Sequence, residues 1–310
     1  MISVLIFTRN EELDLSGCLA SVSWSDDIHV FDSFSSDKTV QIAARFGAFV
    51  HQRQFDNYAS QKNAGLRSVR FRHQWVLLLD ADERIPLPLA EEMKRFVSSA
   101  TSFVSAARLH RRDFFMGTWL KHTQLSPFYI RLVRPRKVRY EREVNEMLKV
   151  EGDICDLIQP FDHFPFSKGI RHWVDKHNVY STMEARIALA REGSCGRYSL
   201  KQAFCAKDFN QRRCHQKGLF LKLPCRPFIK FAYLMLWRRA FLDGRAGITY
   251  ALLQSIYEYF IVLKQRELLA SQRNRAVDPT PRPQVRRDGP GQSEQAQSVH
   301  VHFESVGKPT

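Results

Sequence analysis

The sequence lacks the cysteine patterns of zinc-binding and disulfide-stabilised domains. Its six cysteines lie far apart in 310 residues, and no two of them form a Cys-x-x-Cys pair. A structural zinc site needs closely spaced thiolates, and a small disulfide-rich domain needs a denser framework. We therefore expect reduced thiols in a cytosolic protein.

Long apolar runs are also scarce. The first seven residues are apolar, but charged residues follow from Arg9 onward, too early for a secretory signal. No run reaches the roughly 20 apolar residues that a membrane-spanning helix needs. The best candidate, residues 248–263, is interrupted by Gln254, Ser255 and Glu258. We expect neither a targeting segment nor a spanning helix.

Acidic residues are too few to balance the basic ones. The formal net charge is +15 and the isoelectric point is near 9.8. This excess implies an anionic partner: nucleic acid, a phospholipid surface or a phosphorylated substrate. The sequence carries no recognisable nucleic-acid reader motif, so we expect no nucleic-acid partner.

The basic excess is strongest in residues 201–240, where ten Lys or Arg residues stand against one acid and are interleaved with aromatic residues. If residues 227–242 form a helix, one stripe of it holds Arg226, Lys230, Tyr233 and Trp237. Such a helix is typical of a protein lying in a membrane interface. The alternative is a basic helix that packs on a catalytic domain while its charges face water.

The most informative stretch is residues 75–83, where five apolar residues run into Asp80-Ala81-Asp82-Glu83. The apolar run predicts a strand buried on both faces, as in a parallel sheet between helices. Ligands sit at the carboxyl ends of such strands. Asp80 and Asp82 point the same way if the backbone stays extended, which suits a divalent cation that also binds phosphate. Alone, the motif could equally be a solvated acidic turn.

Strand and helix patterns alternate through the first hundred residues. We expect strands at 2–7, 27–31, 48–51 and 75–79, separated by helices at 15–22, 40–46 and 57–69. This order predicts an α/β fold, Rossmann-like and doubly wound, with a mostly parallel sheet. Parallel strands would bring together three polar clusters: Thr8 to Glu11, Asp32 to Thr39, and Asp80 to Asp82.

The second half is less regular. We expect a helix near Pro86, strands at 103–109 and 129–133, an irregular connection between them, and a helix at 173–191. We predict a catalytic domain at 1–192, with a nucleotide half at about 1–100 and an acceptor half at about 101–192. A basic amphipathic helical region follows at 193–270. Residues 271–310 are rich in Pro, Arg, Gln and Ser, and we expect disorder there.

These motifs, in this order, resemble the inverting glycosyltransferases of family 2, which have the GT-A fold. The resemblance covers roughly residues 1–268, and its second half is similar to bacterial lipopolysaccharide-core β-glucosyltransferases and exopolysaccharide glycosyltransferases. The first half carries Thr8-Arg9-Asn10-Glu11, Asp32-Ser33-x-Ser35-x-Asp37-x-Thr39, Gln61-Lys62-Asn63 and Asp80-Ala81-Asp82-Glu83. The second half carries Val144-Asn145-Glu146, His163, Lys176-His177-Asn178-x-Tyr180-Ser181, Leu223-Pro224-x-Arg226-Pro227 and Phe241-Leu242-Asp243-Gly244.

The resemblance implies a nucleotide-sugar donor, a UDP-sugar, bound at the strand ends. Thr8, Asn10 and Glu11 would line the nucleotide, and Asp32 would hydrogen-bond uracil or ribose with Asp37 nearby. Lys62 and Asn63 would approach the base or the diphosphate. Asp82 would hold Mg²⁺ or Mn²⁺ against the diphosphate, and Asp80 would contact the ribose or support the metal through water.

The acceptor side is implied by later residues. Glu146 would be the general base for the acceptor hydroxyl, although the family often has a histidine where Asn145 stands here. His163 would either complete the metal site or be a hydrogen-bonded histidine in an apolar wall. The acceptor would be a glycolipid or polysaccharide precursor at the cytoplasmic face of the inner membrane, where the protein would be peripheral.

Two other classes are weaker. A sugar-1-phosphate nucleotidyltransferase needs a glycine-rich loop after the first strand, and no glycine precedes Gly17 here. A basic membrane- or nucleic-acid-binding protein without activity would not need Asp32, Asp80, Asp82 and Glu146. We give Asp243-Gly244 no chemical role, since it resembles a helix break and cap.

Overall fold

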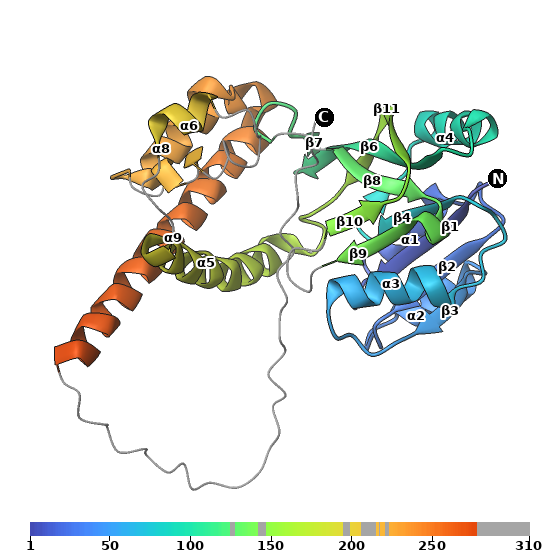
Figure 1. The fold of residues 1–310 in the computed structure, drawn as a ribbon, viewed down its shortest axis with the longest axis horizontal. Helices are drawn as coiled ribbons and strands as arrows, with labels where there is room; N and C mark the ends of the chain where they lie inside the picture. Colours follow the sequence, from blue (N-terminus) through green and yellow to red (C-terminus); the bar gives the residue numbers. More distant parts are fainter. Residues whose placement is uncertain are drawn as a thin grey trace, which may run out of the picture. The chain divides into compact units, whose positions relative to one another are not determined.

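The computed structural model describes residues 1–124, 128–141, 147–194, 199–205, 215–216, 218–220 and 223–277 (Figure 1). The described residues fall into two compact units. The first holds Met1–Trp173 together with Arg239–Gly247, and the second holds Val174–Arg238 and the chain from Ile248. The domain boundary expected at residue 192 stays a prediction.

The first unit is built on a sheet whose N-terminal half follows the predicted alternation. Its elements are β1 (Ser3–Thr8), α1 (Leu15–Ser21), β2 (Ile28–Asp32), α2 (Thr39–Arg45), β3 (Phe49–Gln52), α3 (Tyr58–Ser68), β4 (Val76–Asp80), β5 (Glu83–Arg84) and α4 (Leu87–Ser99). The later elements are β6 (Val104–Phe115), β7 (Thr118–Trp119), β8 (Phe128–Val133), η1 (Pro135–Lys137), β9 (Val138–Glu141), β10 (Met147–Val150) and β11 (Asp153–His163).

The main sheet has the strand order β3-β2-β1-β4-β8-β6-β11-β5, and β7 pairs with β6. Strands β3, β2, β1 and β4 are parallel, and β11 is parallel to β6. Strand β8 is antiparallel to both β4 and β6, and β5 is antiparallel to β11. The expected fold class, a mostly parallel α/β sheet covered by helices, is confirmed.

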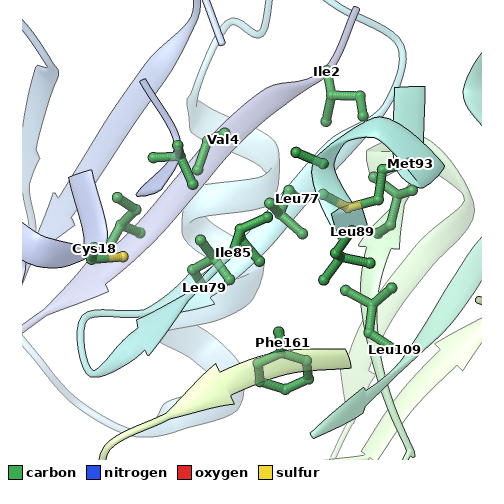
Figure 2. Close-up of a cluster of buried hydrophobic side chains, with 14 of the residues drawn as sticks. Ile2, Val4, Cys18, Leu77, Leu79, Ile85, Leu89, Met93, Leu109 and Phe161 are labelled. Carbon is green, nitrogen blue, oxygen red and sulfur yellow. The ribbon is translucent and has the colours of Figure 1, made fainter. Parts of the chain in front are cut away.

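Alternating side chains of the central strands feed two apolar cores, one on each face. Leu77 and Leu79 of β4 pack with α1 and α4 on one face, where Figure 2 shows them near Leu89 and Phe161. Leu78 packs with α3 and the β9–β10 hairpin on the other face. A strand covered on both sides needs an unbroken apolar run, which explains why residues 75–79 have one.

Strand β11 was not expected from the sequence. Its exposed or half-exposed positions hold polar residues such as Asp156, Gln159 and Asp162, so its apolar pattern is short. Its place in the sheet is instead set by parallel pairing with β6, which runs through Phe115 rather than ending at residue 109. Residues 114–119, expected to be irregular, form the β6–β7 hairpin.

A short segment from the C-terminal half of the chain belongs to the first unit. The carboxylate of Asp243 accepts hydrogen bonds from the backbone N–H groups of His122 and Thr123, the Thr123 hydroxyl and Nδ1 of His122. A Cβ at Gly247 would lie 2.0 Å from the Ala240 carbonyl oxygen, so this approach requires glycine. The Asp243 turn is therefore an anchor and more than a helix cap.

The remaining helices are α5 (Gly169–Ser194), α6 (Leu200–Cys205), α8 (Arg226–Ala232), the π-helical turn η2 (Tyr233–Trp237), η3 (Ala240–Asp243) and α9 (Gly244–Val277). The helix expected at 227–242 breaks at Arg239, whose φ of 57° is left-handed. Helix α9 continues six residues beyond the predicted start of the tail at 271, and residues 278–310 lie outside the described part of the chain.

The basic stripe expected on this segment does not face outward, and that interpretation is wrong for its two charged members. Arg226 is buried, with Nε 3.3 Å from Oε1 of Glu258 on α9 and a hydrogen bond to Gln265. Burial lowers the pKa of the Lys230 ammonium, although attraction to Glu258 opposes the shift. These cations are held inside the second unit because a buried charge needs a partner.

Among the described residues, one helical stretch, Ala240–Gln272, has the length and composition to cross a membrane. It contains the predicted best candidate, residues 248–263. Only 28% of its most apolar 18-residue window is buried inside the structure. Length and composition do not distinguish a spanning helix from the core helix of a soluble protein.

Candidate active site

The candidate site lies at one edge of the main sheet. Strands β1, β2, β4, β6 and β11 run in the same direction, so their carboxyl ends meet there. This edge gathers Thr8, Asp32, Asp80, Asp113 and His163. In open α/β sheets this is the edge at which ligands bind.

His163 joins two of these strand ends to the turn after β4. Its Nδ1 lies 2.6 Å from Oδ1 of Asp113, and its Nε2 lies 3.3 Å from Oδ2 of Asp82. Asp113 is buried, whereas the Asp82 side chain is 29% exposed. Because a carboxylate only accepts, Nδ1 carries the proton toward Asp113 and Nε2 faces Asp82.

Backbone pairing sets this geometry. Strand β5 pairs with the end of β11, so Glu83 lies opposite His163. The Phe164 N–H also donates to the Asp82 carbonyl oxygen over 2.9 Å. The turn Asp80-Ala81-Asp82 is thus held against β11, and Asp82 is turned toward the imidazole.

The imidazole is electrostatically poised to be a cation. Burial alone would lower the pKa of His163, but attraction to Asp82 and hydrogen bonds to Asp113 and Asp82 outweigh it and raise the pKa to about 10. Asp113 is also 3.0 Å from Nε of Arg111. The buried Asp113 thus pairs with two cationic groups, Arg111 and His163.

Asp80 is placed differently from Asp82. One of its carboxylate oxygens accepts a hydrogen bond from Arg131 over 2.8 Å, and Arg131 also pairs with the buried Glu83. The Asp80 N–H donates to Glu83 over 3.0 Å. Attraction to Glu83 and Asp80 outweighs burial and raises the pKa of Arg131. Asp80 is therefore tied to the sheet, and its predicted role, contact with the ribose or support of the metal through water, stays a prediction.

The donor set at Asp82 and His163 fits a divalent cation. Within the described ranges no group of three His, Cys, Asp or Glu side chains is arranged to hold a metal. Two ligands are present, a carboxylate and an imidazole whose other nitrogen is fixed by a carboxylate, an arrangement typical of metal-binding histidines. Oxygen and imidazole donors suit Mn²⁺, and further oxygen ligands would have to come from a bound diphosphate.

Asp32 organises the nucleotide end without being exposed. Its carboxylate accepts hydrogen bonds from the Thr8 hydroxyl (2.9 Å), the Ser35 N–H (2.9 Å) and the Gln52 amide (3.1 Å). The Ser35 hydroxyl donates to it as well. Asp32 and Thr8 are both buried, and the predicted hydrogen bond of Asp32 to uracil or ribose stays a prediction.

Two loops meet at this end: the one after β1, with Asn10 and Glu11, and the one before α2, with Asp37. The Asn10 side-chain oxygen accepts from the Ser36 N–H, and the Glu11 N–H donates to Thr39. Asp37 accepts from the N–H groups of Thr39 and Glu12, which ties the two loops together. Burial raises the pKa of Glu11 to about 7 against the opposing Lys168 ammonium, whose Nζ is 2.6 Å away.

Lys62 and Asn63 face β9. The Asn63 side-chain amide donates to the Tyr140 carbonyl oxygen over 2.8 Å, and its oxygen accepts from the Tyr140 N–H over 2.9 Å. The Lys62 ammonium is buried 5.2 Å from the Tyr140 ring centre. Asn63 therefore joins α3 to β9, and its predicted approach to the base or the diphosphate stays a prediction.

The remaining predicted residue, Glu146, lies outside the described residues, as does Asn145. Three contributors to the site were missed or left open in the sequence: Asp113, Arg131 and Lys168. For Arg131 the sequence leaves two interpretations open, contact with phosphate and a charge at the sheet edge. Asp113 ends an Arg-x-Asp alternation on β6, a signal that becomes meaningful only when β6 is known to lie beside β11.

Comparison with known proteins places the first half of the chain in a defined family. Residues 3–167 match the model of glycosyl transferase family 2. An uncharacterized glycosyltransferase of Rickettsia typhi is 34% identical over 286 residues, covering 88% of this chain and 89% of that protein. A second Rickettsia glycosyltransferase, from Rickettsia bellii, matches over only 32% of this chain and 33% of its own length.

Two further similarities are more distant. The lipopolysaccharide core biosynthesis glycosyltransferase LpsC of Rhizobium meliloti is 27% identical over 195 residues, covering 59% of this chain and 70% of that protein. Among solved structures, S. aureus TarS 1-349 has 14% identity and a TM-score of 0.42, covering 88% of this chain and 91% of the other.

Proposed function

Because the chain belongs to glycosyl transferase family 2, we propose that this glycosyltransferase moves a hexose from a UDP-sugar to a lipid-linked, lipopolysaccharide-core or exopolysaccharide acceptor, with inversion at the anomeric carbon. The observation that carries the proposal is the pairing of Asp82 with His163, backed by Asp113, at the strand ends of the family 2 domain. A diphosphate needs such a site, because its charge grows as the sugar leaves.

The donor binds across the strand ends. Asn10, Glu11 and Asp37 line the nucleotide, and Glu11 accepts hydrogen bonds from donor hydroxyls while Lys168 balances its charge. The buried Thr8 and Asp32 are hydrogen-bonded to each other, and Asp32 also fixes the loop that leads to Asp37 through the Ser35 N–H. Lys62 stays close to the Tyr140 ring and adds positive charge to this end of the site.

Asp82 and His163 would hold Mg²⁺ or Mn²⁺ at the diphosphate. A bound divalent cation supplies the positive charge that stabilises the departing nucleoside diphosphate. Asp113 keeps Nδ1 of His163 protonated, so Nε2 is the nitrogen that would coordinate a metal, once it has lost the proton that it shares with Asp82 in the imidazolium form. Arg131 keeps Asp80 fixed, which sets the position of the turn that carries Asp82.

Glu146 is the proposed general base. It would take the proton of the acceptor hydroxyl as that oxygen forms its bond to the anomeric carbon and the bond to the diphosphate breaks. A single displacement of this kind inverts the anomeric centre. The acceptor assignment rests on the similarity to LpsC, a lipopolysaccharide core biosynthesis glycosyltransferase, and on the +15 net charge. The enzyme would act in the cytoplasm, peripherally on the inner membrane.

A donor screen tests this proposal. Purified protein is offered several nucleotide sugars with Mg²⁺ or Mn²⁺, and nucleoside diphosphate release is read with and without membrane extract. We expect release from a UDP-hexose that rises with extract and disappears with a chelator. Asp82→Asn should lower kcat at least about 100-fold. Asp156→Asn, an exposed carboxylate paired with Arg108 on the same sheet, is the matched control and should retain activity.

Glu146→Gln tests the base separately. Loss of transfer with unchanged UDP affinity supports the assignment, whereas transfer at the wild-type rate removes it. If the rate of sugar transfer is unchanged by a chelator, the metal proposal is contradicted even though the transfer itself is confirmed.

A further inference from the structure

Helix α8 and its continuation η2 present an inverted amphipathic arrangement. The side that packs into the second unit carries Arg226, Lys230 and Leu234, at helical spacing. The side that faces out is apolar: Phe228, Ile229, Ala232, Tyr233, Leu236 and Trp237. Phe228, Leu236 and Trp237 are 78%, 76% and 78% exposed. A helix on a soluble surface normally shows the opposite pattern.

Helix α9, in the same unit, has a second exposed apolar stripe. Ile248, Leu252, Ile256, Tyr259 and Leu263 are all exposed and recur every three or four residues. Fifteen residues separate the ends of the stripe, which is about 22 Å of helix at the usual rise. The opposite face is packed within the unit, where His177 contacts Tyr257 and Nζ of Lys264 bonds to Asn178 and Thr182.

Three charged groups of these two helices, Arg226, Lys230 and Glu258, are directed to each other. Arg226 pairs with Glu258 and Gln265, and Lys230 also faces Glu258. A surface bathed in water would favour exposure of these charges, whereas a surface in an apolar medium requires them to be paired inside. Arginines lie where the outward stripes end: Arg238 and the exposed Arg239 follow η2, and the exposed Arg245 and Arg266 flank the stripe of α9.

The residue types of the outward stripe favour a membrane interface over a protein partner. Trp237 and Tyr233 are the residue types that gather where hydrocarbon meets headgroups. Arginines beside them would meet anionic phosphates. A protein partner or second copy would need a complementary apolar surface, but lipid needs none, and the proposed acceptor is itself lipid-linked.

We infer that the outward faces of α8–η2 and α9 insert into one leaflet of an anionic bilayer, so that the protein is held by buried apolar side chains rather than by surface charge alone. This rests on the proposed function only in placing a lipid-linked acceptor nearby. It replaces the expected basic stripe with an apolar one and gives α9 a position in the membrane plane.

The test measures flotation of the full-length chain with vesicles of phosphatidylethanolamine and phosphatidylglycerol at 3:1. At 1 M salt, charge interactions between exposed groups are screened beyond about 3 Å. We therefore expect the wild type to float about equally at 0.1 and 1 M NaCl. The triple variant Phe228→Ser, Leu236→Ser, Trp237→Ser should partition at least ~100-fold more weakly, since each inserted side chain contributes about tenfold.

The matched control is Phe103→Ser, Ile158→Ser, which removes apolar side chains that are 76% and 82% exposed in the first unit. It should float as the wild type does. Circular dichroism and UDP binding confirm that each variant is folded. As a second measurement, brominated acyl chains should quench the fluorescence of Trp237, assigned by comparison with Trp237→Phe.

Three results would overturn the inference. One is wild-type binding that vanishes at 1 M NaCl, which indicates adsorption by charge only. Another is unchanged flotation of the triple variant. The third is a lipid-free dimer that does not float and that the same substitutions dissociate, which assigns the face to a second copy. Flotation needs no donor or acceptor, and Asp82→Asn should float normally, so failure here is separable from failure of the proposed reaction.

Discussion

Nδ1 of His163 lies 2.6 Å from Asp113, and this contact decides which imidazole nitrogen faces Asp82. The two residues come from parallel strands fifty positions apart and are opposite each other in the β6–β11 register. Asp113 does not reach the proposed metal position itself. It acts on that position through the orientation and basicity of the ring.

We predict that Asp113→Asn weakens Mn²⁺ binding about 10- to 100-fold, because partners that orient a metal-binding histidine have effects of this size. Isothermal titration of Mn²⁺ in the presence of UDP measures it. The control is Asp162→Asn, whose carboxylate pairs with Arg112 and points to the opposite face of β11. Equal losses in both variants would show that Asp113 has only a general electrostatic effect.

We predict that Arg131→Met lowers the free energy of unfolding by about 3–5 kcal/mol, because it leaves Glu83 buried without its ion-pair partner. Urea unfolding measures the change. Arg139→Met removes an exposed arginine paired with Glu141 and should change stability by less than about 1 kcal/mol. If Glu83→Gln is added to Arg131→Met, part of the loss should return; no recovery would contradict the charge argument.

Asp27 should make the free energy of unfolding depend on pH in the acidic range. Burial alone would raise its pKa, but hydrogen bonds from the Ser3 hydroxyl and the Arg72 N–H and the interaction with His29 outweigh burial and lower it. The folded state thus favours the carboxylate, and this contribution is present above the ordinary value of 3.8 and is lost as pH falls below it.

We therefore expect Asp27→Asn to cost about 1–3 kcal/mol at pH 7 and to flatten the fall in stability below pH ~4. Unfolding curves between pH 3 and 7 give both quantities. Asn in place of the exposed Asp153 should leave the curve unchanged. A variant whose acid limb matches the wild type would show that other carboxylates control it.

Asn63→Ala distinguishes a structural amide from a ligand-binding one. Its two hydrogen bonds to Tyr140 predict a loss of about 1–3 kcal/mol in the free energy of unfolding. UDP affinity, measured by titration under folding conditions, should change by less than about threefold. Glu11→Gln is the comparison at the predicted nucleotide loop and should weaken UDP more than Asn63→Ala does. The reverse order would support the nucleotide contact predicted for Asn63 from the sequence.

The sequence was most predictive where one strand is covered on both faces. The apolar runs of β1 and β4 and the polar residues that follow them identify the sheet edge, since buried strands and polar loops have opposite compositions. The place of Asp82 at this edge could be predicted for this reason. Strand β11 could not be predicted. Few of its residues are buried, as Phe161 is, and its many polar residues are of types that are also common in loops.

The orientation of α8 could not be predicted for a different reason. Helical spacing groups Arg226 with Lys230, but it does not say which side of the helix meets the protein. That depends on Glu258, thirty-two residues later on α9. Similarly, the amide of Asn63 is committed by the backbone of Tyr140, seventy-seven residues away, and no local motif encodes that pairing.

The hydrogen bonds of Asp243 to residues 122 and 123 carry a consequence for how the molecule is made. The first unit can make its last contacts only after residues 239–247 have left the ribosome, well after the strands of its sheet have been synthesised. Until then the backbone N–H groups of His122 and Thr123 lack their carboxylate, and the segment beside Leu120 is unanchored. A chain that ends at residue 238 should thus contain the whole sheet but fold less completely, because it lacks Asp243. A premature stop codon in the helical region would therefore impair folding of the first unit.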